Sequence, residues 1–371
     1  MSDDGTVVRT SDRPPGRMPS RRFHQKSRSG CARCKARRVK CDELRPVCSN
    51  CIRQKTVCEY GQVPRSPASS SSGGQHLGFD AKSGFDSLDL VLMHRFATVT
   101  ALELFPAREA QHCWQYVVPK WAEDHNFLMH GLLALAGMDL ARVTPEKRVL
   151  YRTRALHHQQ AGLLIFQEVL SRESAAHIEA IFMFSVILII LAFASPQTED
   201  EVPSVDGILD LFALFRGPRT LATAYWPTIK GQVIEPLVGP RNDNPPTDLP
   251  KYISTYFTDL KFELEEPHRA AWDRLTENIA RSLESQDLRA VGNWPATLHD
   301  EFFSRMRAHD PVALIVLAQF SIVVRKFQSR WWLWKWDRML LQAVDNALSE
   351  EEKRRFDWHP EKLQDLLESI S

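Results

Sequence analysis

Apolar residues recur at helical spacing along most of the chain after residue 86. Spacings of three and four residues place such side chains on one face of an α-helix. Strand-like alternation and hairpin dipeptides are nearly absent. We therefore predict an all-α domain of about ten helices over residues 86–371. Its first helix would bury Leu88, Val91, Leu92, Phe96, Val99 and Leu102.

Capping residues and prolines mark where these helices begin and end. Three predicted starts combine an N-cap with a first-turn proline or a capping box: Thr144-Pro145, Asp310-Pro311 before the run Val312 to Phe327, and Ser349 with Glu352. Gly217-Pro218 predicts a helix end. The polar stretch 239–250 predicts a loop that divides the domain into two lobes.

The longest apolar run extends from Ala180 to Ala194, broken only by Ser185. A helix that spans a bilayer needs about 18 residues or more, so this run favours a buried core helix over membrane contact. The N-terminus is polar and has no apolar stretch typical of a signal peptide. We expect a reducing compartment, where cysteines bind metals or stay buried as thiols.

Composition divides the chain into four parts. Residues 1–30 are rich in Arg, Ser and Pro and predict a disordered basic tail. Residues 31–60 hold six of the seven cysteines, and residues 61–85 form a Ser/Gly/Pro linker. The all-α domain, residues 86–371, follows. The chain is therefore predicted to be mostly α, with a small cysteine module at one end.

Charge is concentrated at the same end. The first 65 residues hold 16 Lys and Arg but six Asp and Glu, whereas the whole chain has a net charge of only +1. A basic head on an acidic body indicates a polyanionic partner for the head. DNA, RNA and an anionic membrane all satisfy this charge pattern.

The six cysteines form two halves with the same spacing, Cys-x2-Cys-x6-Cys. A structural zinc ion takes four ligands, so two ions need eight positions. Six thiolates fill eight positions if two of them bridge, most simply Cys31 and Cys48. The predicted cofactor is two Zn²⁺ ions in a structural site, and the predicted ligands are Cys31, Cys34, Cys41, Cys48, Cys51 and Cys58.

The module has too little apolar content to fold without metal. Its few apolar residues are Val39, Leu44, Val47, Ile52 and Val57. Between Cys34 and Cys41 lies KARRVK, which predicts a short helix through Lys35 to Lys40. A helix presented by a metal cluster commonly enters the major groove, where Arg and Lys pair with guanine. We predict DNA contacts by Lys35, Arg37, Arg38 and Lys40, although the same residues also fit a nuclear import signal or a solvated basic face.

The segment CARCKARRVKCDELRPVCSNCIRQKTVCEY resembles the fungal Zn(II)2Cys6 binuclear-cluster family without a gap. The resemblance implies that Cys31 and Cys48 bridge the metals, that Arg37 and Arg38 read bases, and that Pro46 turns the inter-half loop. It also implies double-stranded DNA with CGG-type triplets as the partner, often bound by a dimer. Because residues 61–85 lack heptads, the helical domain would supply any homodimer contact.

Three later segments are similar to the regulatory domain of the sterol uptake control type of zinc-cluster factors. They are SLDLVLMHRFATVTALEL, NFLMHGLLALAGMDLA and YRTRALHHQQAGLLIF. The resemblance implies an all-helical regulatory domain over roughly residues 86–170 and beyond, with a small apolar ligand as a further partner. Many regulators of fungal secondary-metabolite gene clusters share this domain.

Other residues suggest chemistry but fit structural roles. His157, His158 and His177 lack ligand spacing and predict surface or core-edge positions, and Cys113 predicts a core thiol. The tryptophans at 331, 332, 334 and 336 span more than one helical face, so core packing, a ligand pocket and a partner surface are all open. The final segment EKLQDLLESIS favours a plain last helix over a co-activator contact. No catalytic motif is present.

These features predict a nuclear transcription factor of RNA polymerase II genes that is not an enzyme and does not bind a membrane. We expect an activator of a fungal secondary-metabolite gene cluster. The alternatives are a regulator of sterol or lipid metabolism genes, and a zinc-stapled adaptor that binds nucleic acid without sequence preference.

Overall fold

The computed structural model describes residues 30–43, 48–54, 56, 58, 86–171, 178–196, 202–231, 234–238, 248–260, 263–285 and 287–370. The predictions of a tail over 1–29, a linker over 61–85 and a loop over 239–247 lie outside these residues, as do those made for Leu44, Pro46, Val47, Val57 and His177. Two compact units are present, Met1–Gly78 and Phe79–Ser371. Every regular element in the described residues is helical, which confirms the predicted fold class.

The described residues of the first unit form two short helices, α1 (Ala32–Ala36) and α2 (Ser49–Arg53). Each begins directly after a cysteine, because Cys31 and Cys48 are the N-cap residues. Its buried cluster consists of cysteines alone, packed against Cys58. Val39 and Ile52 are 45% and 62% exposed. The described part of this unit therefore has no apolar core to hold it together.

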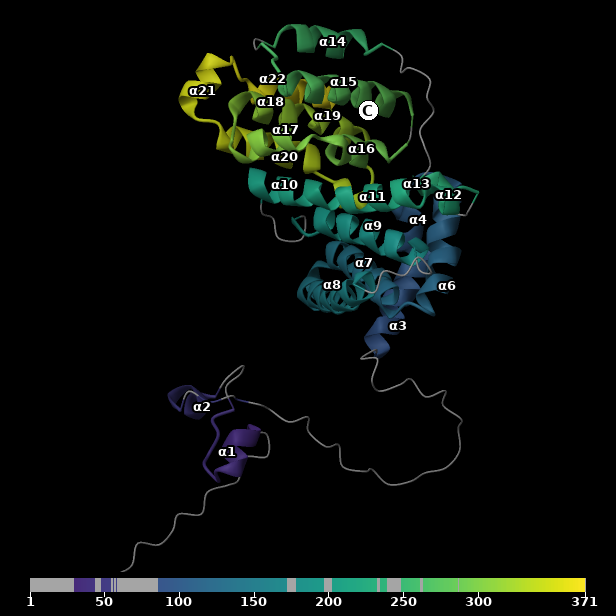
Figure 1. Cartoon of the computed structure of the whole chain (residues 1–371), viewed down its shortest axis with the longest axis vertical. Coiled ribbons are helices and arrows are strands. Elements are labelled where there is room, and N and C mark those ends of the chain that lie inside the picture. The colour runs from purple at the N-terminus through teal and green to yellow at the C-terminus, as the bar shows by residue number, and fades with distance from the viewer. Residues whose placement is uncertain are drawn as a thin grey trace, which may run out of the picture. The chain divides into compact units, whose positions relative to one another are not determined.

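The second unit is a helical array with one continuous apolar core. Its N-terminal helices are α3 (Ser87–Arg95), α4 (Ala101–Leu104), α5 (Arg108–His112), α6 (Val118–Ala122), α7 (Asn126–Val143) and α8 (Arg148–Leu170). In Figure 1, α3, α7 and α8 lie at one end of this unit, and α9 (Ile178–Ala194), α10 (Val205–Leu214) and α11 (Arg216–Ala224) lie across its middle. α7 packs along α8 and also contacts α9.

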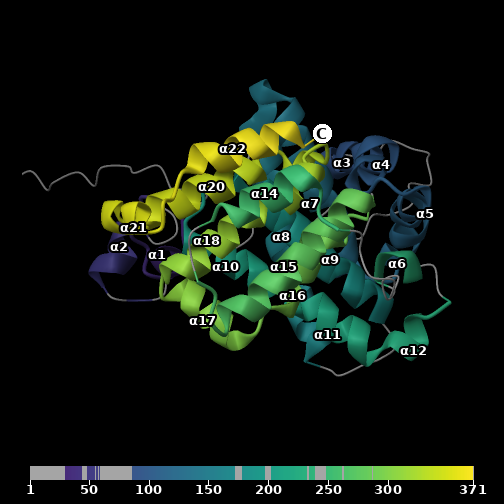
Figure 2. The ribbon, with the colours of Figure 1, turned by 90° about the horizontal axis from the view of Figure 1, so that it is seen from above.

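The remaining helices lie between residues 226 and 369. They are α12 (Trp226–Ile229), α13 (Glu235–Val238), α14 (Lys251–Thr258), α15 (His268–Glu284), α16 (Ala290–Thr297), α17 (Asp300–Arg307), α18 (Pro311–Gln319), α19 (Ser321–Lys326), α20 (Trp336–Ala347), α21 (Glu350–Arg355) and α22 (Pro360–Ser369). Seen from above in Figure 2, α15 lies beside α16, and α20 lies beside α22. The prediction of about ten helices was too low because several predicted long helices are divided into short ones.

Helix boundaries test the capping predictions individually. Asp310 accepts a hydrogen bond from the Ala313 amide, and Ser349 forms a capping box with Glu352, so both predicted starts are confirmed. Thr144 instead precedes a short 3-10 turn and its side chain makes no capping bond. A helix ends close to the stop predicted at Gly217-Pro218, because α10 ends at Leu214, but Pro218 itself lies in the first turn of α11. A proline is tolerated there, since the first amides of a helix have no partner within it.

The face predicted for the first helix is only partly correct. Leu92 and Phe96 are fully buried, but Val91 is 48% exposed. Residues 96–100 form a π-helical turn between α3 and α4. A π turn holds more residues than an α turn, so it changes which side chains face the core: Thr100, the last residue of the turn, is buried, and Val99 is only partly buried.

α9 corresponds to the long apolar run and is mostly buried. No single helix in the described segments is long and apolar enough to cross a membrane, and one sharply bent pair, Asp300–Arg307 with Pro311–Lys326, passes the length and composition test together. Cys113 is fully buried, as predicted, and burial raises the pKa of its thiol to about 12. The segment EKLQDLLESIS lies largely in α22, whose Leu363 and Leu367 are in the core.

A buried polar cluster joins the first three long helices, and we call it the Asp89 cluster. Asp89 on α3 accepts two hydrogen bonds from Arg154 on α8, at 2.8 and 2.6 Å. His158, also on α8, donates through Nε2 to Asp89 over 2.8 Å, and its Nδ1 lies 2.8 Å from Nδ1 of His130 on α7. With Nε2 of His158 protonated, its Nδ1 accepts and His130 donates. The placement of His158 at the surface or core edge was therefore wrong.

The Asp89 cluster makes stability depend on pH. Burial lowers the pKa of His130 from 6.5 to about 4. In the unfolded chain His130 keeps its ordinary pKa of 6.5, so below that pH the unfolded chain binds more protons than the folded chain. The free energy of unfolding therefore falls as the pH drops from about 6.5 towards about 4. We expect a loss on the order of 3 kcal/mol over this window, since one pKa unit corresponds to about 1.4 kcal/mol.

Urea denaturation at a series of pH values measures this dependence. His130→Gln removes the titrating group while keeping an amide that can donate, so we expect a flatter profile. His94→Gln, at an exposed position, serves as the control and should follow the unchanged chain. Equal slopes for His130→Gln and the unchanged chain would contradict the assignment to His130.

Candidate metal centre and nucleic-acid interface

The structure brings all six predicted ligands of the cysteine module together. Their sulfur atoms form two groups of four, and within each group the atoms lie within 4.8 Å of one another. Cys31 and Cys48 belong to both groups. The first group adds Cys34 and Cys41, and the second adds Cys51 and Cys58.

The sulfur spacing fits tetrahedral zinc. Zinc–sulfur bonds of about 2.3 Å in a tetrahedron place neighbouring sulfur atoms about 3.8 Å apart. The Sγ–Sγ distances are 3.8 Å for Cys31–Cys48, 3.7 Å for Cys31–Cys51 and 3.7 Å for Cys34–Cys48. The donor set is thiolate only and leaves no place for a reacting water, so it suits a structural ion.

Equivalent hydrogen bonds from backbone amides to sulfur position the cysteines in both halves. The Cys31 amide donates to Sγ of Cys41 over 3.5 Å, and the Cys48 amide donates to Sγ of Cys58 over 3.4 Å. A hydrogen bond from the Cys34 amide lowers the pKa of the Cys31 thiol, whereas burial raises the pKa of the Cys51 thiol to about 12. Because zinc binds thiolates, metal binding releases protons here.

Polar contacts of Asp42 and Asn50 join the halves, and the sequence did not predict them. The Asp42 carboxylate accepts from the Ser49 amide at the start of α2, at 3.1 and 3.2 Å from its two oxygens. Asn50 donates through Nδ2 to the Lys40 carbonyl over 2.6 Å. Asp42 acts as a capping group from seven residues upstream, a spacing outside the usual capping patterns. These contacts fix the first half against the second.

The predicted helix through Lys35 to Lys40 is wrong in extent. α1 ends at Ala36, Arg37 is its C-cap, and Arg38 has a left-handed backbone with φ of 58°. The Val39 amide donates back to the Cys34 carbonyl. The chain must turn here because Cys41 has to return to the sulfur group that already contains Cys34.

The predicted DNA-contact residues are all exposed. Lys35 lies on α1, whereas Arg37, Arg38 and Lys40 lie in the turn that follows it. Arg33, which the sequence analysis did not select, is also exposed on α1. The module thus presents a basic surface, defined as Arg33, Lys35, Arg37, Arg38 and Lys40, with guanidinium and ammonium groups suited to guanine edges and phosphates.

Comparison with known proteins agrees with this geometry. Residues 29–67 match the family model described as "Fungal Zn(2)-Cys(6) binuclear cluster domain". The chain is 32% identical over 202 residues to "Zn(2)-C6 fungal-type transcription factor afumD" of Aspergillus fumigatus, which covers 52% of this chain and 53% of that protein. A "Zn(2)-C6 fungal-type transcription factor" of Gibberella zeae is 24% identical over 400 residues, covering 85% and 81%. The chain thus spans about half the length of the Aspergillus relative.

A third relative matches only a short part of the chain. "Sterol uptake control protein 2" of Candida albicans is 46% identical over 69 residues, which is 17% of this chain and 10% of that protein. This match concerns the DNA-binding domain alone. The likeness of the helical unit to sterol-type regulatory domains therefore stays a prediction.

Proposed function

Since the chain carries a fungal-type Zn(2)-Cys(6) domain that binds two zinc ions, as do the transcription factors it resembles, we propose that it is a sequence-specific DNA-binding transcription factor. The observation that carries the proposal is the pair of sulfur groups sharing Cys31 and Cys48, next to an exposed basic turn. The two relatives are named transcription factors rather than enzymes.

The six cysteines act as ligands, with Cys31 and Cys48 bridging the two ions. Four sulfur atoms surround each ion, so six thiolates supply eight positions. Zinc then replaces the apolar core that the described part of the module lacks. The arrangement supports a structural role, in which the metal fixes the position of the basic surface.

The turn after α1 is the part that reads bases. The left-handed backbone at Arg38 follows the end of α1, so Arg37, Arg38 and Lys40 lie in an exposed turn. Arginine is the side chain that pairs bidentately with guanine O6 and N7, which fits CGG-type triplets. Lys35 and Arg33 on α1 are placed for phosphate contacts, which position the module without specifying sequence.

The helical unit regulates this activity. Its alignment with the Gibberella relative extends over most of the chain, which supports a shared two-part organisation. We place the protein in the nucleus, as its family implies, and assign it to activation of a secondary-metabolite gene cluster on the resemblance of the helical unit. Homodimerisation through this unit belongs to the same proposal. A role in sterol metabolism is the alternative, and the 69-residue Candida match adds nothing specific to it.

The test is an unbiased DNA selection with the whole zinc-loaded chain. We expect enrichment of one or two CGG-type triplets, and their spacing reports a monomer or a dimer. Arg37→Ala with Arg38→Ala should lose the enrichment and weaken binding to the selected site by about 100-fold, because each bidentate base contact contributes roughly 1–3 kcal/mol.

The matched control is Arg53→Ala on α2, an exposed arginine outside the basic surface. It should keep the selected sequence. Binding without any enriched sequence that simply fades as salt rises would identify a non-specific nucleic-acid adaptor instead.

A further inference from the structure

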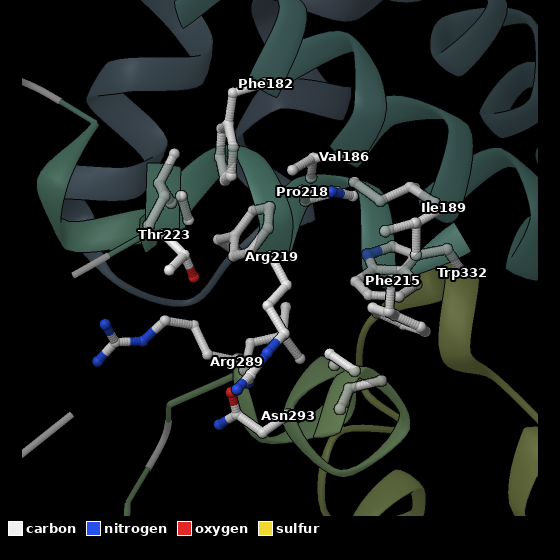
Figure 3. Close-up of a pocket in the computed structure, with 18 of the residues that line it drawn as sticks. Phe182, Val186, Ile189, Phe215, Pro218, Arg219, Thr223, Arg289, Asn293 and Trp332 are labelled. Carbon is white, nitrogen blue, oxygen red and sulfur yellow. The ribbon is translucent and has the colours of Figure 1, made fainter. Parts of the chain in front are cut away.

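The helical unit contains a cavity whose lining is apolar at one end and polar at the other. It has a volume of about 520 Å³ and lies between α9, α11 and α16. Phe182, Val186 and Ile189 of α9 line it together with Phe215 and Trp332. Figure 3 shows these side chains on one side, with Arg289 and Asn293 on the other. Ligand pockets commonly measure roughly 300–1,000 Å³ and combine apolar walls with a few polar groups.

Close helix packing shapes this cavity. A Cβ atom added at Gly292 of α16 would lie 2.8 Å from the Phe215 ring. The absence of a side chain at this position lets α16 approach Phe215. Trp332 presents its ring and no free donor to the cavity, because its Nε1 donates to the Leu104 carbonyl. The apolar end therefore offers surface without hydrogen-bonding groups of its own.

Two donors at the polar end have no acceptor in the described part of the chain. Nδ2 of Asn293 is buried and makes no hydrogen bond there. Arg219 of α11 lines the same end, and its guanidinium forms no ion pair or hydrogen bond with any described residue. A buried amide without a partner costs roughly 1–3 kcal/mol. An acceptor on a bound molecule removes this cost.

A second hollow adjoins the polar end and shares Arg219, Asn293 and Ala296 with the first. Arg274, which lines it, donates to the Thr297 carbonyl and to Nε2 of His299, and neither partner is a carboxylate. Arg281 pairs with Glu277, and Arg289 pairs with Asp287. Arg219 and Arg274 thus lack a carboxylate partner among the described residues, which leaves the polar end positive.

We propose that this cavity binds a small amphipathic carboxylate, with its apolar body against Val186 and Trp332 and its carboxylate between Arg219 and Asn293. The planar guanidinium matches a carboxylate, and the Asn293 amide supplies one further donor. A regulatory effect of this ligand on transcription rests on the proposed function. The binding of the ligand does not rest on it, because the cavity lies wholly within the helical unit.

Calorimetric titration of the full zinc-loaded chain with dodecanoate and with dodecanol tests the proposal. The two probes share an apolar body, and only dodecanoate is charged. We expect one dodecanoate per chain and at least about tenfold weaker binding of dodecanol, the low end of what a hydrogen bond to a charged group contributes. Failure of the intact chain to bind dodecanoate, or equal affinity for both probes, overturns the proposal.

Variants test where the carboxylate and the apolar chain of the ligand bind in the cavity. Arg219→Ala and Asn293→Leu should each weaken dodecanoate binding about tenfold while leaving dodecanol binding unchanged. Val186→Phe, which fills the apolar end, should weaken both probes. Arg354→Ala, at an exposed position of α21 away from the cavity, is the control and should change neither.

Equal binding of dodecanoate by Arg219→Ala, Asn293→Leu and the unchanged chain would place the ligand elsewhere and overturn the assignment. Thermal unfolding of each variant checks that it is folded. Binding of the selected DNA site, measured on the same preparations, separates the two proposals: lost DNA binding with intact dodecanoate binding contradicts only the transcriptional function, and the reverse contradicts only this inference.

Discussion

Cys48→Ser is expected to remove most zinc from the chain and to abolish specific DNA binding. Cys48 belongs to both sulfur groups, so its loss leaves each ion with three thiolates. A structural zinc site contributes about 10–16 kcal/mol of apparent free energy to folding in small modules. The described part of this module has no other apolar cluster to compensate, since its buried cluster consists of cysteines.

Native mass spectrometry gives the zinc content, and fluorescence anisotropy with the selected site gives the DNA affinity. Cys34→Ser is the matched comparison, because Cys34 belongs to one group only, and it should retain more zinc than Cys48→Ser. Cys113→Ser should keep two ions, since Cys113 lies in the core of the helical unit. Two zinc ions in Cys48→Ser would rule out a bridging role.

Asp89→Ala should destabilise the helical unit by about 3–5 kcal/mol, the usual cost of removing one partner from a buried ion pair. Arg154 has a side chain only 17% exposed and would lose both hydrogen bonds to Asp89. His158, which is fully buried, would lose the acceptor of its Nε2 proton. Because domains are stable by about 5–15 kcal/mol, this loss is a large fraction of the total.

Urea denaturation followed by circular dichroism measures the change. Asp210→Ala is the control: Asp210 pairs with Arg307 in an ion pair whose acid is 72% exposed. Such surface pairs contribute about 0–1 kcal/mol. If Asp89→Ala cost no more than Asp210→Ala, the Asp89 cluster would not hold α3, α7 and α8 together.

The cysteine module is the part of the site that the sequence predicts best. Ligand identity follows from spacing, because metal geometry constrains cysteines that lie close in the chain. The extent of α1 does not follow, since Lys, Ala and Arg at 35–38 are good helix formers and the return of Cys41 to the sulfur group requires the left-handed turn at Arg38. Asp42 was missed for a similar reason, because its partner Ser49 lies beyond the local capping range.

The helical unit shows where sequence periodicity reaches its limit. The apolar pattern predicts helices, but the π turn over 96–100 rotates one of them and changes which residues are buried. Asp89 and His158 are 69 residues apart, and the sequence pattern places both on a polar surface. Trp332 and Trp334 were left open between core, pocket and partner surface, and the fold assigns Trp332 to the cavity and leaves Trp334 48% exposed.

The two main walls of the cavity differ in how firmly they are held. α9 is buried along most of its length, whereas α11 has no fully buried residue. Local opening of a protein needs least free energy where few buried apolar contacts must break. The amides of α11 should therefore exchange with solvent well before those of α9, and we expect α11 to be the wall that moves when a ligand enters the proposed site.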